Sequence, residues 1–329
     1  MLEFSDVLAA RERISPYIKH TPLLRLEALD KAAGFEVYLK PENLQATGSF
    51  KLRGASNKLM SLSEDELKRG VIAASSGNHA QGVAAAAARL GADALIVMPQ
   101  NAPALKVAGA RALGAKIVLH PSSLSSEREA HMRELAAEQG RVIVHPYADD
   151  LVKAGQGVAA LEILEDERRI SAIVAPVGGG GLISGLATAA KGIKSDLIMV
   201  GVEPAGAARY SQSRAAGQPL TIKTEHTIAD GTRGNYASPA NFPLIEARVD
   251  ALTQADDETL QAAIYAYAKL AKLTVEPSGA LPLAALLSGK LGFLRGQKVC
   301  LMISGGNLDF SLYTEWLTHG EEILARLGF

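Results

Sequence analysis

The sequence predicts an α/β protein of two domains, each a mostly parallel, twisted sheet with helices on both faces. At 329 residues the chain is too long for one typical domain, and its length suggests two. Strand and helix patterns alternate between Val71 and Val144, which implies right-handed crossovers and a parallel sheet. A second alternation of the same kind begins near Leu151 and continues to Ser304.

The segment before the first alternation has its own short elements. A helix is predicted over Asp6–Lys19, because apolar residues recur on one side of it. Short strands are predicted at Leu23–Leu26 and Val37–Lys40, around a small helix at Glu27–Ala33. Another helix is predicted over Phe50–Leu62.

Apolar runs and turn residues define the elements of the two alternations. In the first, strands are predicted at Val71–Ala74, Ala94–Met98, Lys116–Leu119 and Arg141–Val144, with helices at Asn78–Leu90, Ala104–Leu113 and Ser125–Glu138. In the second, strands are predicted at Ala172–Pro176, Leu197–Glu203 and Lys298–Ser304, with helices from Leu151 to Glu167 and at Leu182–Lys191, Asp257–Lys272 and Gly279–Leu287. The region Gln212–Ala247 is rich in Gly, Pro, Thr and Asn, and we expect it to be irregular.

Composition excludes several classes of function. A formal net charge of −1, without a dense basic patch, argues against nucleic acid or an anionic membrane as a partner. No apolar run approaches the ~18 residues of a membrane helix, and the first residues do not resemble a secretory signal. Cys300 is the only cysteine, so the chain has no intrachain disulfide. We therefore expect a cytoplasmic protein.

Lys51 is the first candidate for chemistry. It stands between Phe50 and Leu52 rather than among charged residues, which indicates a partly buried face at the start of a helix. Burial and the helix dipole both disfavour the ammonium form and lower the pKa of the amine. Such an amine can act as a nucleophile or a base and can form a Schiff base. A surface lysine with its stem packed on apolar neighbours would show the same local pattern.

Three polar loops each follow a predicted strand. They are Ser75-Ser76-Gly77-Asn78-His79, the four glycines Gly178, Gly179, Gly180 and Gly181, and Ser304-Gly305-Gly306-Asn307. Ligands of parallel sheets bind at the carboxyl ends of the strands. Glycines allow close approach of the backbone, and the N–H groups at a helix start favour an anion. The glycine run is therefore a candidate phosphate site, although tight connections also use Gly and Asn for structural reasons alone.

Two nucleotide sites compete for the glycine run. The chain lacks the Gly-Lys-Ser/Thr signature of a P-loop, which argues against a nucleotide triphosphatase. A nicotinamide-dependent dehydrogenase remains an alternative, because Gly179, Gly181 and Gly185 imitate a dinucleotide fingerprint and Glu203 ends the next strand. That alternative leaves Lys51 and the other two loops without a role.

Pyridoxal 5'-phosphate accounts for all four features, since it needs a lysine, a phosphate cradle and partners for its ring oxygen and ring nitrogen. The motifs resemble the pyridoxal-phosphate-dependent serine/threonine dehydratase and serine racemase family, of the tryptophan-synthase-β-like fold type II. The resemblance covers nearly the whole chain. Beside the three loops and Ser49-Phe50-Lys51-Leu52-Arg53-Gly54, it includes Thr21-Pro22-Leu23, Lys40-Pro41-Glu42-Asn43-Leu44-Gln45, Ala154-Gly155-Gln156-Gly157, Ala229-Asp230-Gly231 and Glu276-Pro277-Ser278-Gly279.

The resemblance implies roles for the matched residues. Lys51 would form the Schiff base with the cofactor, and Phe50 would pack on its ring. Asn78 would bond the phenolic oxygen, Gly178 to Gly181 would hold the phosphate, and Ser304 would face the pyridine nitrogen. Ser75, Ser76, Gly77, Asn78 and His79 would bind the carboxylate of the substrate.

The family fold implies that residues 53–144 form a small domain inserted in a large cofactor-binding domain of residues 1–52 and 145–329. The cofactor would lie in the cleft between them. A homodimer is implied as well. Because Phe329 follows soon after the Ser304 loop, we expect no regulatory domain.

The implied activity is that of an ammonia-lyase that dehydrates and deaminates a β-hydroxy amino acid, L-threonine or L-serine, to a 2-oxo acid and ammonia. Lys51 would remove the α-proton. An amino-acid racemase is the alternative, in which Ser76 would protonate the opposite face; dehydratases carry the same loop. Dehydration of hydroxyaspartate or another β-hydroxy amino acid is a further alternative.

The sequence departs from the family pattern at two places, one where some members bind a metal ion and one near the substrate. Some members bind a divalent cation through a glutamate, a carbonyl and an aspartate; here Glu203 and Ala207 match, but Arg209 replaces the aspartate. Since Mg²⁺ and Ca²⁺ require oxygen ligands, we predict no metal site at Glu203 and instead a pairing with a cation such as Arg209. Arg233 or Tyr236 could adapt the pocket to a larger or acidic substrate, and Arg128 could contact the substrate carboxylate. For each arginine, a surface position is the alternative.

Overall fold

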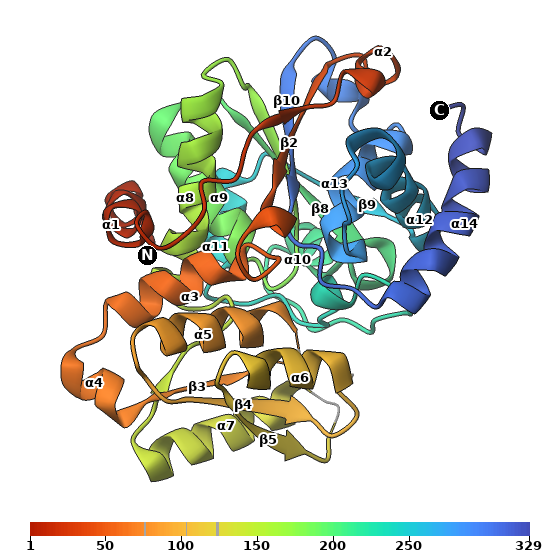
Figure 1. Ribbon diagram of the computed structural model, residues 1–329. Coiled ribbons are helices and arrows are strands. Elements are labelled where there is room, and N and C mark those ends of the chain that lie inside the picture. The colour runs from red at the N-terminus through yellow and green to blue at the C-terminus, as the bar shows by residue number, and fades with distance from the viewer. Residues whose placement is uncertain (76, 103, 123–124) are drawn as a thin grey trace.

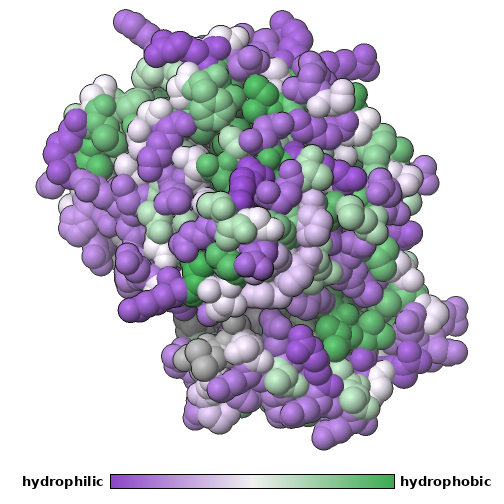
Figure 2. Space-filling model, turned by 180° about the vertical axis from the view of Figure 1, so that it is seen from behind, coloured by the Kyte–Doolittle hydropathy of each residue, from purple (hydrophilic) through white to green (hydrophobic). Residues whose placement is uncertain are grey.

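The computed structural model describes residues 1–75, 77–102, 104–122 and 125–329. These residues form two bodies, each built on a mostly parallel sheet, which confirms the predicted fold class (Figure 1). The space-filling view from behind shows the smaller body below the larger one, with hydrophilic residues spread over both (Figure 2). Among the described helices, none is both long and apolar enough to cross a membrane.

The large sheet has the strand order β1-β2-β10-β7-β8-β9. Its strands are β1 Leu24–Arg25, β2 Glu36–Pro41, β7 Ala172–Pro176, β8 Ile198–Pro204, β9 Ala251–Ala255 and β10 Lys298–Ile303. β1 pairs antiparallel with β2, and every other pairing is parallel. The central strand β7 is fully buried, as its continuous apolar run predicts.

The small sheet has the order β5-β4-β3-β6 and is wholly parallel. Its strands are β3 Val71–Ala74, β4 Ala94–Pro99, β5 Lys116–His120 and β6 Val142–Ile143, and the crossover helices are α5 Asn78–Arg89, α6 Ala104–Ala112 and α7 Ser125–Gln139. All four strands lie inside the predicted insertion. The two domain boundaries themselves remain a prediction.

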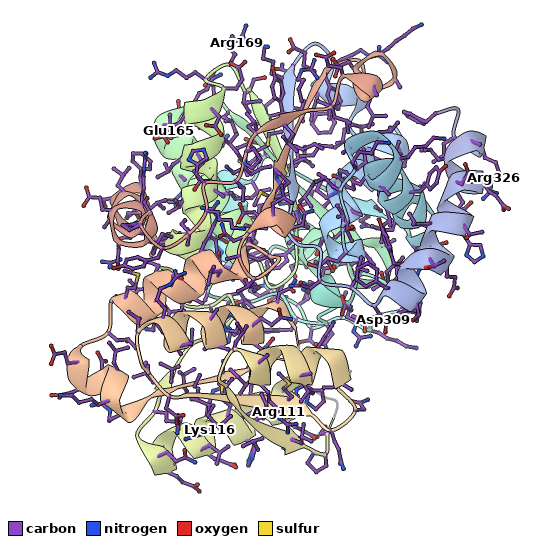
Figure 3. The ribbon with its side chains drawn as sticks, viewed as in Figure 1. Arg111, Lys116, Glu165, Arg169, Asp309 and Arg326 are labelled. Atoms are coloured by element: carbon purple, nitrogen blue, oxygen red, sulfur yellow. The ribbon has the colours of Figure 1, made fainter. Side chains whose placement is uncertain are left out.

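Helices cover both faces of the large sheet, and the apolar side chains buried beneath them form two separate cores. One core includes residues of α1 Phe4–Ile14, α8 Asp150–Asp166, α9 Gly181–Ile193 and α11 Phe242–Arg248. The other includes residues of α12 Asp257–Ala266, α13 Pro277–Leu287 and α14 Phe310–Arg326. Figure 3 shows the charged side chains of Arg169 and Arg326 on the outside of this body.

Helix α3, Lys51–Met60, lies between the two bodies and contacts both α8 and α5 (Figure 1). Glycines permit this close packing: a Cβ on Gly54 would lie 2.6 Å from the carbonyl oxygen of Val152. A Cβ on Gly82 of α5 would lie 3.0 Å from the carbonyl carbon of Lys51. The start of α3 is therefore fixed from both sides.

Several elements differ from the sequence prediction. The segment predicted to be irregular contains α11 and the end of α10, Arg209–Ala216, and the edge strand β9 follows it. α4 Glu64–Arg69 and α14 were not predicted, although Ser63 and Glu66 form a capping box and the Asp309 side chain caps α14. Between β1 and β2 the structure has a 3₁₀ turn, Glu27–Leu29, followed by α2 Asp30–Ala33. A short element such as α4 has weak periodicity, which explains why the pattern missed it, but this reason does not apply to the long, amphipathic α14.

Candidate active site

The three predicted loops lie at the carboxyl ends of strands and meet where the two bodies join. Ser304 follows β10 and Gly178 comes just after β7, and these two strands are neighbours in the large sheet. The third loop follows β3 of the small sheet. Asn307 connects the bodies, because its Nδ2 atom donates to Oδ1 of Asn78 at 2.8 Å.

Lys51 is the first residue of α3 and lies at this junction. The backbone N–H of Phe50 donates to the Ser304 carbonyl at 3.0 Å, which holds the start of the helix against the end of β10. The Lys51 Nζ atom donates to the carbonyl oxygen of Pro146 at 2.8 Å and lies 5.1 Å from the centroid of the Phe50 ring. Burial lowers the pKa of Lys51 to about 8, against the opposing charge of Glu276. A larger fraction of this amine is therefore neutral at neutral pH than in an exposed lysine, and the neutral form is the one that acts as a base or nucleophile.

Asn78 is the first residue of α5, and both the nitrogen and the oxygen of its side-chain amide are hydrogen-bonded. Nδ2 donates to Oε1 of Glu276 at 2.7 Å, and Oδ1 accepts from Asn307. The amide nitrogen carries two hydrogens, and among the described residues only Glu276 accepts from it, so one N–H is available for a ligand.

The four glycines form a tight turn into α9. Gly180 has φ +87°, a left-handed conformation that favours glycine. A Cβ on Gly179 would lie 2.3 Å from a ring carbon of Tyr147, and one on Gly180 would lie 2.6 Å from the Tyr210 hydroxyl oxygen. Any larger residue would therefore collide with the aromatic rings that surround the turn.

Tyr210 and Asn241 fix the orientation of the glycine turn, and sequence reasoning missed both. The Gly179 carbonyl accepts from the Tyr210 hydroxyl at 2.9 Å and from Asn241 Nδ2 at 2.7 Å. In a trans peptide the next N–H points the opposite way, so these bonds turn the Gly180 N–H away from both side chains. Both residues lie in or beside the region predicted to be irregular, and no local motif marks them.

The glycine turn and Lys51 fit pyridoxal phosphate. The turn has no side chains of its own to block its N–H groups, and it precedes a helix of 13 residues whose N-terminus favours a phosphate. Lys51 supplies an amine of lowered pKa, and Asn78 supplies a free N–H. The Ser304 side chain is 4% exposed and lies at the end of the strand next to the turn, as expected of a neutral partner for the ring.

Comparison with known proteins identifies the family. The model of the pyridoxal-phosphate dependent enzymes matches residues 14–305. The chain belongs to this family. The catabolic L-threonine dehydratase of Staphylococcus aureus (strain N315) is 40% identical over 326 residues, which cover 98% of this chain and 94% of the relative.

Solved structures agree with the family assignment. The chain superposes on maize serine racemase with a TM-score of 0.92 and 36% identity, covering 98% of each chain. A threonine deaminase from T.th. has a TM-score of 0.88 and 44% identity, covering 94% of this chain and 99% of the other. The predicted family, its cofactor and the enzyme class of pyridoxal-phosphate-dependent ammonia-lyases are thus confirmed.

The loop Ser75–His79 is predicted to bind the substrate carboxylate, and the structure describes four of its five residues. Ser76 lies outside the described residues. Ser75 Oγ accepts from the Gly77 N–H at 3.2 Å, and Gly77 precedes α5, so the loop leads into a helix N-terminus as predicted. The His79 side chain is 2% exposed, and its Nε2 lies 2.8 Å from the Val144 carbonyl. Burial lowers the pKa of His79 to about 3, so the ring is neutral and ties α5 to the end of β6.

Glu203 is poorly suited to bind a divalent cation. Its carboxylate accepts from the N–H groups of Tyr210 and Ser211, both at 2.8 Å, and from the Ser211 hydroxyl at 2.7 Å. The Ala207 carbonyl accepts from Arg209 at 3.1 Å. The Arg209 guanidinium donates to the carbonyls of Ala207, Thr232 and Gly234, and its charge acts on the Glu203 carboxylate, so the pairing of the two residues stays a prediction.

The same contacts argue against the dehydrogenase alternative. In a dinucleotide site the acid at the end of the second strand must reach the ribose. The Glu203 side chain is fully buried and caps the first N–H groups of α10. The membership of the pyridoxal-phosphate family accounts for the glycine run without this role.

Proposed function

We propose that the chain dehydrates and deaminates a β-hydroxy amino acid, L-threonine or L-serine, to a 2-oxo acid and ammonia. The observation that carries the proposal is the position of the Lys51 amine, which has a lowered pKa. It bonds Pro146, the residue before the Tyr147 that packs on the glycine turn, and its neighbour Phe50 bonds Ser304. The names of the threonine dehydratase and threonine deaminase relatives support this choice of substrate.

Lys51 has the central role in the proposed reaction. When bound, pyridoxal phosphate supplies an electron sink for the bond that breaks at the α-carbon. The Lys51 amine, once freed by the incoming amino acid, accepts the α-proton, and its lowered pKa makes the neutral form accessible near neutral pH. The β-hydroxyl takes up a proton and leaves as water. The released enamine tautomerises to an imine, and water hydrolyses the imine to the 2-oxo acid and ammonia.

The start of α5 is proposed to bind the substrate carboxylate. Its first N–H groups have no partner within the helix, and the helix dipole favours a negative charge there. Ser75 and Gly77 shape the turn that precedes it. We propose a role for the Ser76 hydroxyl here by resemblance to the family alone.

The first experiment is spectroscopic and is followed by a substrate panel. Purified protein should absorb visible light, and borohydride should bleach the band and fix the cofactor on Lys51, as seen by peptide mass spectrometry. The panel should then test L-threonine, L-serine and β-hydroxyaspartate for release of 2-oxo acid and for the D-enantiomer. A protein that forms D-serine faster than pyruvate would contradict the dehydratase proposal and favour racemisation.

One observation favours an acidic substrate as a second candidate. Burial lowers the pKa of Arg128 against the opposing charge of Glu129, and the charge of Arg233 adds to the lowering, so the two arginines lie near one another. Arg128 is on α7 of the small body, whereas Arg233 is exposed just after Asp230–Thr232 of the large one. A second carboxylate on the substrate would be attracted by both positive charges. If Arg233→Ala leaves the ranking of the panel unchanged, this candidate is excluded.

We also propose a homodimer in the cytoplasm. The resemblance to the family supports the dimer, and the single, buried Cys300 is consistent with a reducing compartment. Light scattering coupled to size exclusion measures the mass directly, and a monomer at micromolar concentration would contradict the dimer.

A further inference from the structure

Glu276 is a buried carboxyl group beside the candidate active site. It immediately precedes α13, but its side chain makes no capping hydrogen bond to that helix. Its backbone N–H donates to the Gly305 carbonyl at 3.1 Å, and the residue is 5% exposed. The backbone of Glu276 is therefore held in place, and its carboxyl is available to accept a hydrogen bond from a group outside α13.

Gly305 makes room for this carboxyl. A Cβ at Gly305 would lie 2.3 Å from Oε1 of Glu276 and 3.0 Å from Cβ of Ser49. The Ser304 loop can thus lie between Glu276 and the segment that carries Lys51 only because it has no side chain at this point. The carboxyl reaches Asn78 past this glycine.

Glu276 and Asn307 together determine which way the Asn78 amide faces. Glu276 Oε1 accepts from Asn78 Nδ2 at 2.7 Å, and Asn78 Oδ1 accepts from Asn307 Nδ2 at 2.8 Å. Asn307 is held in turn by the Thr47 carbonyl at 2.8 Å. If the Asn78 amide were flipped, two NH₂ groups would meet at Asn307, whose own orientation is held by Thr47, and that bond would be lost. With Glu276 ionised, oxygen would also face oxygen, and the second bond would be lost as well.

The acceptor role of Glu276 does not depend on its charge. Burial, with Asp230 as the next contributor, raises the pKa of Glu276 to about 8, while Asn78, Lys106 and Lys51 act in the opposite sense. A protonated carboxyl still has an oxygen with free lone pairs. Either form can therefore accept from Asn78.

We propose that Glu276 is a positioning residue, which holds the free N–H of Asn78 toward the ring oxygen of pyridoxal phosphate. The inference rests on the proposed role of Asn78 in cofactor binding. It adds a residue that acts through Asn78 without contacting the cofactor, and it explains why the carboxyl is buried beside a glycine.

Titration of the apoprotein with pyridoxal phosphate tests the proposal, with affinity and the position of the visible band as readouts. Glu276→Ala should weaken binding roughly fivefold, the value of one hydrogen bond, and should shift the band. Glu276→Gln keeps an acceptor oxygen without a charge and should bind within about twofold of wild type. Equal losses in the two variants would show that the charge matters and would overturn the proposal.

A double-mutant cycle tests whether Glu276 acts through Asn78. Adding Glu276→Ala to Asn78→Ala should change affinity by less than about twofold, since the group being positioned is already absent. If the two losses multiply instead, Glu276 has an independent role and the proposal fails. Asp230→Asn is the matched control, because it alters a charge near Glu276 but leaves the contact with Asn78. A loss in Asp230→Asn equal to that in Glu276→Ala would overturn the proposal.

Two further measurements distinguish a variant that does not fold, a failure of the proposed function and a failure of the positioning role alone. Circular dichroism and chemical unfolding of each apoprotein show whether it folds; if Glu276→Ala does not, Asn307→Ala removes the other bond that orients Asn78 and should shift the same band. Wild-type protein that does not attach the cofactor at Lys51 would refute the proposed function itself. Normal attachment together with unchanged binding in Glu276→Ala and Asn307→Ala would refute only the positioning role.

Discussion

The Nζ atom of Lys51 lies 2.8 Å from the carbonyl oxygen of Pro146, the residue at which the chain has just left the small sheet. Lys51 itself begins the helix that leads into the small body. The two passages of the chain between the bodies therefore meet at the amine. This hydrogen bond needs only an N–H donor, so it is compatible with both the neutral and the charged amine.

Replacement of Lys51 should abolish the chemistry. We expect Lys51→Ala to lower 2-oxo acid formation by about 10³-fold or more, because both the attachment point and the base are removed. The visible band of the holoenzyme should also be lost after dialysis. Lys68→Ala is the control, since the Lys68 side chain is 72% exposed and belongs to α4, at the outer edge of the small body (Figure 1). Residual activity within tenfold of the control would contradict the role of Lys51.

His79 should make the apoprotein sensitive to acid. The pKa of His79 is about 3 in the folded chain and about 6.5 when unfolded, so the unfolded state binds more protons between these values. Stability should therefore fall as the pH decreases from about 6.5, by up to roughly 1.4 kcal/mol per pH unit. His79→Gln should remove this part of the pH dependence, as measured by urea unfolding at pH 5 and pH 7. Parallel curves for variant and wild type would contradict the prediction.

Arg53 stabilises the start of α3 through a buried ion cluster. Its guanidinium donates to both oxygens of Glu42, each at 2.7 Å, and to both oxygens of Glu162, at 2.6 and 2.8 Å. Lys40 also pairs with Glu162 at 2.6 Å. We expect Arg53→Met to cost about 3–5 kcal/mol of unfolding free energy, because it removes the ion-pair partner of the buried Glu42 and leaves Glu162 with Lys40 alone.

The matched control for Arg53 is Arg326→Met at the surface pair with Glu258, which should cost at most about 1 kcal/mol. Figure 3 shows Arg326 on the outer side of α14. If chemical unfolding gives equal losses for the two variants, the buried cluster has no special importance.

Gly179→Ala should weaken cofactor binding. The added methyl group would lie 2.3 Å from the Tyr147 ring, so either the ring or the turn must move. We expect at least a tenfold loss of affinity for pyridoxal phosphate, which corresponds to about 1.4 kcal/mol. Gly91→Ala at a turn of the small body is the control for added volume, since no atom lies within 4 Å of its Cβ position, although its φ of +65° costs some stability. Fluorescence titration that finds unchanged affinity in Gly179→Ala would show that the turn is not the phosphate site.

Divalent cations should have no effect at Glu203. Both of its carboxylate oxygens already accept hydrogen bonds, and Arg209 uses the neighbouring Ala207 carbonyl. We expect Mg²⁺, Ca²⁺ and EDTA each to leave the melting temperature and kcat unchanged. A rise in melting temperature of several degrees with Mg²⁺ that Glu203→Gln removes would contradict this expectation.

Much of the fold was predictable, because strongly periodic segments between buried strands specify their own structure. The strands at Val71–Ala74 and Ala172–Pro176 agree with the prediction residue for residue. The edge strand β9 is half-buried and lacks a continuous apolar run, so only its pairing with β8 identifies it. Helix α11 begins in a segment rich in turn residues, and its apolar side chains become buried only against α9.

By itself the sequence determined the family, the cofactor and the candidate lysine, because each depends on a short run of residues with local chemistry. Lys51 beside Phe50, four successive glycines and a serine after a buried strand can be recognised from the order of residues alone. Only the tertiary structure decided which groups hold them. Glu276 is 198 residues from the Asn78 amide that it orients, and Tyr210 is 31 residues from the Gly179 carbonyl that it bonds. Hydrogen bonds depend on distance and direction in space, and sequence separation of this size carries no information about either.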